Sequence, residues 1–338
     1  MPNTMLAVVK EKSEIGVSVK KLPLPTPLID EVLVKVISAS ICGTDIGIFN
    51  WTPWAKGHIT PPIIIGHEIV GEILEINSKS STNLKKGDLV SSETHIFCNK
   101  CYQCQINNRH ICEKMELFGI GRNGSFAEYA TIPIRTTWKN NTAIPIKTMS
   151  AQEPLGNAVH VVTKAQVTGK TVCIFGLGPT GLCAAAVAKA YGAKKVIGIN
   201  RREYRRRLAL KLGADEVYES LPKQYINSCD VVLEMSGNSK ILESALDAVR
   251  IAGTLVFFGI PKEPAIIDIG KYIINKEITT HSVFGRRIWE TWHQVNDLLV
   301  NKKLDLSALV THSFKLSQFE KAMDVMKSGE CGKILLIP

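Results

Sequence analysis

The chain has 338 residues, of which 45% are hydrophobic and 21% charged, and its formal net charge at pH 7 is +10. This length allows two domains with separate cores, and the composition is typical of a globular protein and excludes a disordered or fibrous one. No apolar run has the length of a membrane span, and the first residues show no pattern of a secretion signal, so we expect a cytoplasmic protein with reduced thiols and no membrane partner.

The first 150 residues are predicted to form short β-strands separated by Gly, Pro, Asn and Asp. The strand patterns cover 5–10, 31–39, 68–76 and 88–92. The same part of the chain, with the residues just after it, contains cysteine, histidine and glutamate residues of the types that bind zinc. They are Cys42 in ICGTD, His67 and Glu68 in GHE, and Glu153 in QEPLG. A thiolate, an imidazole and a carboxylate can bind zinc as three protein ligands and leave a fourth position for water or substrate. Taken singly, each also fits a buried thiol, a packed histidine or an acid at a helix start.

A run of four cysteines follows, with the spacing C-x2-C-x2-C-x7-C: Cys98, Cys101, Cys104 and Cys112. Four thiolates at this spacing can close a tetrahedral site, and zinc is the usual occupant. In the ferredoxin pattern of iron–sulfur proteins the fourth cysteine follows after three residues and precedes proline. Disulfides are the other alternative. A closed site of four thiolates has no position for a substrate, so we expect structural zinc here and the chemistry elsewhere.

From Thr171 onward, strands alternate with helices, which predicts βαβ units and a parallel sheet. Strands are expected at 171–175, 195–199, 230–234 and 254–259, and helices at 182–191, 205–212 and 239–251. Irregular β structure around 305–314, a helix at 318–327 and a strand at 333–337 resemble the first part of the chain. We therefore expect a nucleotide domain, residues 157–294, inserted into a catalytic zinc domain formed by residues 1–156 and 295–338.

Gly176, Gly178 and Gly181 form G-x-G-x-x-G directly after a predicted strand and at the start of a helix. The first glycine permits a tight turn, the second lets the backbone approach a pyrophosphate, and the third allows close packing of helix on strand. The N–H groups at the helix start can then bind the phosphates. The pattern in this context predicts a dinucleotide site; a glycine-rich turn that has lost its ligand is the alternative.

The end of the second strand of the nucleotide domain predicts which dinucleotide binds. NAD enzymes usually place Asp or Glu there, whereas this chain has Asn200, Arg201 and Arg202, with Arg205 one turn into the helix. Guanidinium groups can bind a 2′-phosphate in bidentate fashion, so NADP is favoured over NAD. Arg206 and Arg207 are expected only to face solvent. This assignment accounts for the basic cluster without a nucleic-acid partner.

The chain resembles the zinc-dependent medium-chain dehydrogenases of the alcohol dehydrogenase superfamily over essentially its whole length. Within that superfamily it is most similar to the L-threonine 3-dehydrogenase family. The matching segments are SICGTDIGIFNWTPWA (40–55), PPIIIGHEIVGE (61–72), SSETHIFCNKCYQC (91–104), EPLGNAVH (153–160) and FGRRIWETW (284–292).

The resemblance implies an α/β protein with a GroES-like β-rich catalytic domain, a Rossmann domain with a doubly wound parallel sheet, and assembly into a homotetramer. It implies two zinc ions per chain: a catalytic zinc held by Cys42, His67 and Glu153 with Glu68 beside it, and a structural zinc in the cysteine run. Thr44 matches the hydroxyl that takes the alcohol proton, and His95 matches a histidine near the substrate. The matching cofactor positions are Pro179, Thr180, Phe258, Gly259, Ile260, Val283 and Phe284.

The chain departs from the threonine enzymes at two places. Gly47 stands where the family has a histidine that relays the proton to solvent, and Asn200–Arg202 replaces the usual NAD loop. An Asn-Arg-Arg loop also occurs in NADP-using glucose dehydrogenases of the superfamily. The expected activity is therefore oxidation of L-threonine or a similar small hydroxy compound. A sugar or polyol dehydrogenase is the alternative, and a zinc-binding protein without catalysis is a third.

Overall fold

The computed structural model describes residues 2–261 and 263–338. The chain folds into two units, one formed by residues up to Glu153 together with Val310–Pro338, and the other by Pro154–Leu309. The sequence placed the second boundary at 294/295, which lies inside helix α9 (Glu290–Val300). Trp292 and Leu298, on either side of that point, are both buried, so the apolar face of α9 packs along its whole length. The second unit continues beyond this helix to Leu309.

The first unit is built on a largely antiparallel sheet. Its strand order is β10-β6-β5-β3-β18-β17, and β9 also pairs with β3. The bounds are β3 (Glu31–Ile41), β5 (Ile69–Asn77), β6 (Leu89–Ser92), β9 (Tyr129–Pro133), β10 (Thr137–Lys139), β17 (Val310–Lys315) and β18 (Lys333–Ile337). A smaller sheet has the order β2-β1-β4, with β1 (Thr4–Lys10), β2 (Ser18–Pro23) and β4 (Ile63–Ile64).

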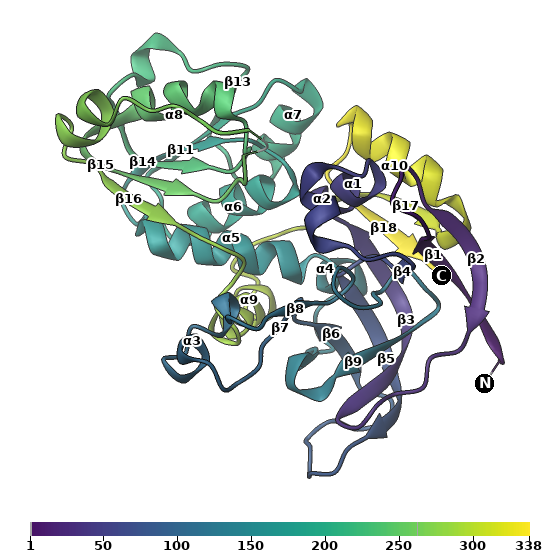
Figure 1. The fold of residues 1–338 in the computed structure, drawn as a ribbon. Helices are drawn as coiled ribbons and strands as arrows, with labels where there is room; N and C mark the ends of the chain where they lie inside the picture. Colours follow the sequence, from purple (N-terminus) through teal and green to yellow (C-terminus); the bar gives the residue numbers. More distant parts are fainter. Residues whose placement is uncertain (1, 262) are drawn as a thin grey trace. The chain divides into compact units, whose positions relative to one another are not determined.

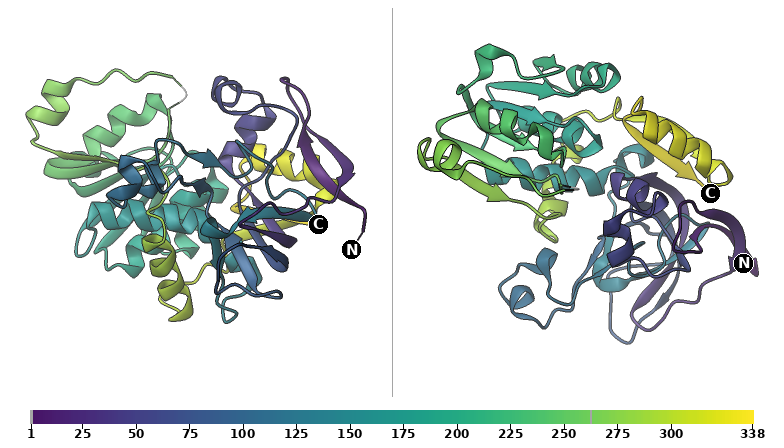
Figure 2. Two further views of the ribbon diagram at one scale, coloured as in Figure 1. Left: turned by 60° about the horizontal axis from the view of Figure 1, so that its bottom comes forward. Right: turned by 45° about the horizontal axis from the view of Figure 1, so that its top comes forward.

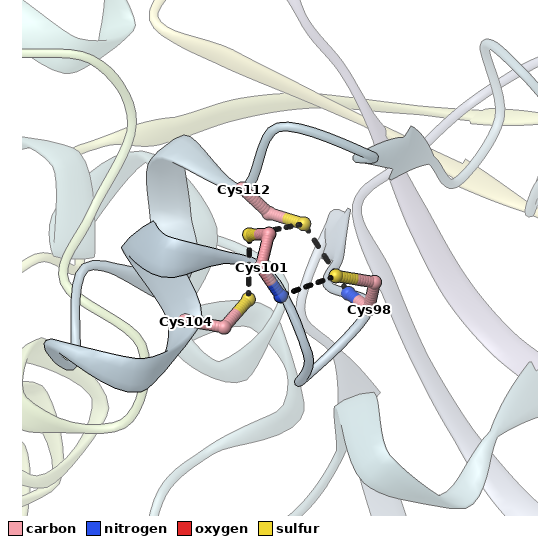
Figure 3. Close-up of side chains that lie close together, drawn as sticks. All are labelled: Cys98, Cys101, Cys104 and Cys112. Atoms are coloured by element: carbon pink, nitrogen blue, oxygen red, sulfur yellow. Dashed lines mark hydrogen bonds between the residues drawn. The ribbon is translucent and has the colours of Figure 1, made fainter.

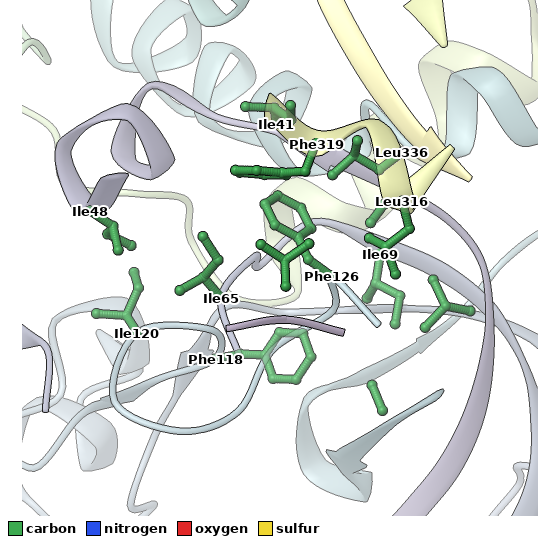
Figure 4. Close-up of a cluster of buried hydrophobic side chains, with 14 of the residues drawn as sticks. Ile41, Ile48, Ile65, Ile69, Phe118, Ile120, Phe126, Leu316, Phe319 and Leu336 are labelled. Atoms are coloured by element: carbon green, nitrogen blue, oxygen red, sulfur yellow. The ribbon is translucent and has the colours of Figure 1, made fainter. Parts of the chain in front are cut away.

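The last residues of the chain complete this sheet. Strand β18 pairs antiparallel with β3 and parallel with β17, and Figures 1 and 2 show it, with helix α10 (Phe319–Ser328), among the elements of the first unit. Phe319 of α10 packs against Phe126, with ring centroids 5.6 Å apart, in the apolar cluster drawn in Figure 4. Because both rings are fully buried, this contact contributes to holding the C-terminal segment in the first unit.

Short elements connect the strands of the first unit and carry its polar residues. They are helices α1 (Gly43–Phe49), α2 (Pro53–His58), α3 (Tyr102–Gln105) and α4 (Ile146–Met149), the 3-10 helix Arg109–Ile111, and the paired strands β7 (His95–Ile96) and β8 (Glu116–Leu117). Helix α5 (Gln152–Ala165) begins at the end of this unit.

The second unit contains a parallel sheet with the strand order β13-β12-β11-β14-β15-β16. Its strands are β11 (Thr171–Phe175), β12 (Lys195–Ile199), β13 (Glu216–Tyr218), β14 (Cys229–Glu234), β15 (Val249–Phe257) and β16 (Thr279–Ser282). Its helices include α6 (Pro179–Ala190), α7 (Glu203–Lys211), α8 (Leu242–Ala248) and α9. Figure 1 shows helices on the faces of this sheet. In such a sheet, ligands bind beyond the carboxyl ends of the strands where the strand order reverses.

One predicted helix of the second unit is too long. The sequence predicted a helix over 239–251, but α8 ends at Ala248 and strand β15 begins at Val249. Val249 and Ile251 are β-branched and favour a strand, and Ala252 adopts a φ of 55°, which a helix does not allow. Among residues 2–261 and 263–338, no helix has both the length and the apolar character that crossing a bilayer requires.

Candidate functional site

The four cysteines of the run converge on one point, as Figure 3 shows, and the segment 98–112 is called the cysteine lobe below. The Sγ atom of Cys101 lies 3.5 Å from that of Cys104 and 3.8 Å from that of Cys112. Sulfurs about 2.3 Å from one zinc ion lie about 3.8 Å from one another, so the arrangement fits a tetrahedral zinc. It does not fit a pair of disulfides, because all of these thiols are free.

The thiols of the lobe differ in how readily they ionise. N–H groups of Lys100 and Cys101 lower the pKa of Cys98 to about 6. Burial, together with the neighbouring thiols, raises the pKa of Cys104 to about 12. Four thiolates repel one another unless a cation lies between them, so full ionisation of this set requires a bound metal.

A second group of candidate ligands lies in the first unit. Ligand atoms of Cys42, His67 and Glu68 lie within 4.8 Å of one another. Cys42 precedes helix α1, and its backbone N–H donates to Oδ2 of Asp45 at 2.8 Å. His67 and Glu68 directly precede β5 and are 4% and 1% exposed, so their polar atoms face the protein interior.

Negative groups surround His67. Its Nδ1 atom lies 3.8 Å from Oδ1 of the buried Asp45. Burial opposes a charge on the imidazole, but the thiol of Cys42, Asp45 and Glu153 together raise the pKa of His67 to about 10. The same negative neighbours would favour a bound cation such as zinc.

Glu68 forms a buried ion pair with a residue from the far end of the chain. The Nζ atom of Lys333 lies 2.5 Å from the Glu68 carboxylate, and both side chains are 1% exposed. Burial opposes a charge on Lys333, yet the carboxylate of Glu68 raises its pKa above the ordinary value. The hydroxyl of Ser40 donates to the same carboxylate. Glu68 therefore has two protein partners beside the candidate metal position.

Glu153 lies in the first turn of α5 and is 8% exposed. Its charge raises the pKa of both His67 and Lys333, so it belongs to the same electrostatic cluster as the other candidate ligands. The hydroxyl of Ser40, in β3, also donates to the carbonyl oxygen of Ser150 at 2.8 Å. This bond connects β3 to the residues just before α5.

Thr44 and His95, the two residues expected near the reacting atoms, also lie in the first unit. The Sγ atom of Cys42 lies 3.8 Å from Oγ1 of Thr44. Both the backbone N–H and Nδ1 of His95 contact Oε1 of Glu93, at 2.9 and 2.7 Å. Glu93 is fully buried, so it fixes the imidazole orientation and places the proton on Nδ1.

The predicted glycine turn opens helix α6 at the carboxyl end of β11. Gly176 has a φ of 99°, and a side-chain carbon on it would lie 2.7 Å from Cβ of Ser236. A side-chain carbon on Gly181 would lie 2.0 Å from the carbonyl oxygen of Gly176. Gly178 precedes α6, whose first residues are Pro179 and Thr180. The close contacts at Gly176 and Gly181 leave no space for a side chain at either position. A turn that presents its backbone to a pyrophosphate requires this.

The arginine loop lies at the carboxyl end of β12. Oδ1 of Asn200 accepts the backbone N–H of Arg202 at 2.9 Å, and the side chains of Arg201 and Arg202 are exposed. Nη1 of Arg205 lies 4.0 Å from the place that a side chain on Gly178 would occupy, so this guanidinium reaches the glycine turn. At least one guanidinium group of this region therefore lies next to the candidate pyrophosphate site.

The expectation that Arg206 only faces solvent is wrong. Its Nη1 donates to the carbonyl oxygens of Asn200 and Arg201, at 2.8 and 2.9 Å, because the helix turns this side chain back toward the loop. Arg207 is exposed and lies 3.8 Å from Glu203.

The remaining predicted cofactor positions follow two neighbouring strands. Phe258, Gly259 and Ile260 follow β15, and Val283 and Phe284 follow β16. The structure therefore brings them to the same carboxyl edge of the sheet as the glycine turn.

Sequence reasoning missed the residues that support the candidate ligands, namely Ser40, Asp45, Glu93, Lys333 and, at the nucleotide site, Arg206. The role of Asp45 could have been predicted from the local sequence, since an acid three residues after the residue that precedes a helix often accepts that residue's backbone N–H. Lys333 had only a weak one, a lysine opening an apolar strand.

Two family models match the chain: an alcohol dehydrogenase GroES-like domain over residues 29–145 and a zinc-binding dehydrogenase domain over residues 179–301. The L-threonine 3-dehydrogenase of Caldanaerobacter subterraneus subsp. tengcongensis is 41% identical over 348 residues, covering 100% of both chains. A zinc-binding dehydrogenase of Sinorhizobium meliloti 1021, solved with NADP bound, has a TM-score of 0.89 and 27% identity, covering 100% of both chains. Galactitol-1-phosphate dehydrogenase of Escherichia coli has a TM-score of 0.89 and 27% identity, covering 99% of this chain and 100% of that one.

Proposed function

The chain belongs to the zinc-dependent medium-chain dehydrogenases, and from this premise we propose that it oxidises L-threonine or a similar small hydroxy compound, with NADP preferred over NAD. As a member of this family it is an alcohol oxidoreductase that uses zinc and a nicotinamide cofactor. The observation that carries the substrate proposal is the 41% identity, over the whole chain, to an L-threonine 3-dehydrogenase.

In the proposed site, Cys42, His67 and Glu153 hold a catalytic zinc, and Glu68 stands beside it as a neighbour or an exchanging ligand. Ligand atoms of Cys42, His67 and Glu68 lie within 4.8 Å of one another, and the charge of Glu153 acts on His67, which supports a metal position at this place. The ion pair of Glu68 with Lys333 favours the neighbouring role, because it reduces the negative charge available to the metal. The cysteine lobe holds the second, structural zinc.

A bound zinc would lower the pKa of the alcohol, and a bound nicotinamide would supply the hydride acceptor. The chain's own residues manage the proton and the substrate. Thr44, beside Cys42, accepts the alcohol proton on Oγ1 while its own hydroxyl proton passes to water. His95 offers Nε2 as an acceptor to a polar group of the substrate, because Glu93 accepts the proton on Nδ1.

The preference for NADP rests on the loop after β12. It has no carboxylate to repel a 2′-phosphate, and it presents Arg201 and Arg202 to solvent beside the glycine turn. The bonds from Arg206 to two loop carbonyls hold this loop in shape, which reduces the entropy lost when a phosphate binds.

The second candidate function is oxidation of a sugar or polyol. Gly47 and the Asn200–Arg202 loop depart from the threonine enzymes, and galactitol-1-phosphate dehydrogenase shares the fold with a TM-score of 0.89. The chemistry at the metal would be the same, and the substrate would differ.

A panel of purified-enzyme assays tests both candidates. L-threonine, aldoses and polyols are each assayed with NADP and with NAD, and we expect the highest kcat/KM with L-threonine and NADP. A higher value with a polyol would replace the first candidate by the second. No turnover with any substrate, together with one zinc per chain, would favour a binding protein. We further propose a homotetramer in the cytoplasm, which light scattering and cell fractionation test.

A further inference from the structure

Glu234 is a buried carboxylate that the proposed mechanism does not use. It is the last residue of β14 and is 4% exposed. Strand β14 lies between β11 and β15, so Glu234 reaches the carboxyl edge of the sheet between the glycine turn and the segment after β15. An isolated carboxylate in such a place costs free energy unless hydrogen bonds compensate for its lost hydration.

Three backbone segments meet around this residue. A side-chain carbon on Gly176 would lie 2.7 Å from Cβ of Ser236, so the glycine turn touches the segment after β14. A side-chain carbon on Gly237 would lie 2.4 Å from the carbonyl oxygen of Ile260, and one on Gly259 would lie 2.0 Å from the nitrogen of Gly237. The glycine turn and the segments 235–237 and 258–260 therefore form one junction at backbone contact distance.

The Glu234 carboxylate holds the middle segment of this junction. Its Oε1 accepts the backbone N–H of Ser236 at 2.9 Å and also the Ser236 hydroxyl, and its Oε2 accepts the N–H of Gly237 at 3.3 Å. Oγ of Ser236 in turn accepts the N–H of Asn238 at 3.1 Å. The backbone oxygen of Glu234 accepts the N–H groups of Phe258 and Gly259, at 2.9 and 3.0 Å.

In the side-chain bonds, both carboxylate oxygens of Glu234 act as acceptors, as they do in the ionised form. Both oxygens face donors, and a glutamine would turn its amide N–H₂ toward one of those N–H groups. Burial raises the pKa of Glu234, and the donors from Ser236 and Gly237 lower it in part. Among the described residues, no neighbouring charge enters this balance, so the hydrogen bonds from Ser236 and Gly237 are what oppose the effect of burial.

We propose that Glu234 is a positioning residue for the dinucleotide: it fixes the Ser236–Gly237 turn against Gly176 and Gly259 and so sets the shape of the cofactor site. The carboxylate acts through the backbone and does not itself touch the reacting atoms. This proposal requires a nicotinamide cofactor and does not depend on which alcohol is oxidised.

The test compares Glu234→Gln and Ser236→Ala with the control Glu219→Gln, which changes an exposed carboxylate of the same unit. The zinc-loaded proteins are titrated with NADPH and, separately, with NADH, and the melting temperature is measured without cofactor. We expect Glu234→Gln to raise the Kd of the tighter dinucleotide about tenfold and Ser236→Ala about threefold. The control should bind like the wild type.

Steady-state kinetics supply the second readout, with any alcohol that the wild type oxidises. Glu234→Gln should raise the KM for the cofactor while kcat at saturating cofactor changes less than about threefold. An unchanged Kd together with a lower melting temperature would show that Glu234 only stabilises the fold, and would overturn the proposal. If Glu234→Gln does not fold, an unchanged Kd in Ser236→Ala has the same consequence.

Discussion

Gly47 occupies a position at which the dehydrogenases that the chain resembles have a proton-relaying histidine. In the structure it lies in α1, and a side-chain carbon on it would lie 3.4 Å from Oγ1 of Thr52. Among the described residues, a β-carbon at this position therefore meets only the threonine hydroxyl, at about van der Waals distance. In the proposed mechanism, the proton of Thr44 leaves through water, because Gly47 offers no side chain to carry it.

We expect Gly47→His to raise kcat at low pH, where loss of the proton from the site is slowest. An imidazole there would carry the proton to solvent in place of water. The measurement is the pH profile of kcat for wild type, Gly47→His and the control Gly47→Ala. An identical profile for all three would show that proton release does not pass this position.

The arginine loop allows a second prediction for single residues. Replacing Arg201 and Arg202 together by alanine should raise the KM for NADP about 10–100-fold, because charge-assisted bonds to the 2′-phosphate are lost. The KM for NAD should change less than about threefold. Arg207→Ala is the control, since Arg207 is an exposed arginine of the following helix α7 and its Nη1 atom lies 3.8 Å from Oε1 of Glu203. Equal effects on both cofactors would contradict the assignment.

At the scale of elements, the cysteine lobe differs from the second group of candidate ligands (Cys42, His67, Glu68 and Glu153) in how many segments of the chain contribute to it. The lobe brings its ligands together within one short segment, and backbone N–H groups lie 3.3–3.4 Å from the Sγ atoms of Cys98 and Cys112. The second group draws on α1, the residues before β5 and the start of α5. Loss of a ligand should therefore act locally in the lobe and on catalysis in the second group.

The matched variants Cys104→Ser and Cys42→Ser test this difference. Each should lower the zinc content by one ion per chain, as measured by metal analysis. Cys104→Ser should lower the melting temperature and keep kcat at 25 °C within about threefold, since a structural zinc contributes to folding. Cys42→Ser should lower kcat by at least about 100-fold. Equal loss of activity in both would contradict the separation of roles.

The sequence predicted those parts of the site that depend on local spacing. The glycine turn and the cysteine lobe lie where they were expected, because their residues are close in sequence and the strand or loop that carries them determines their geometry. The predicted α/β architecture is confirmed. Lys333 could not be predicted to contact Glu68, since the two are 265 residues apart. Arg206 was misjudged because a basic helix pattern does not show which guanidinium turns back to its own loop.

At the scale of the whole molecule, the first unit joins both parts of the chain through an apolar cluster. Phe126 and Phe319 lie in this cluster, and both are fully buried. Phe319→Ala should lower the free energy of unfolding of the first unit by about 3–5 kcal/mol through lost burial and a cavity. Chemical denaturation followed with separate probes for the two units would measure it. Lys321→Ala, on the exposed face of the same helix, is the control, and a similar loss there would contradict the role of the cluster.

Strand β18 has a consequence for the order in which the protein matures. The second unit is one continuous stretch, Pro154–Leu309, so a ribosome releases all of it before the residues that complete the first unit. Until β18 emerges, β3 has an open edge and Glu68 lacks its lysine partner. Domains generally fold as units during synthesis. The unit that begins first is therefore completed last. The carboxylate of Glu68, beside the candidate metal position, gains the positive charge of Lys333 only when the last strand has been added.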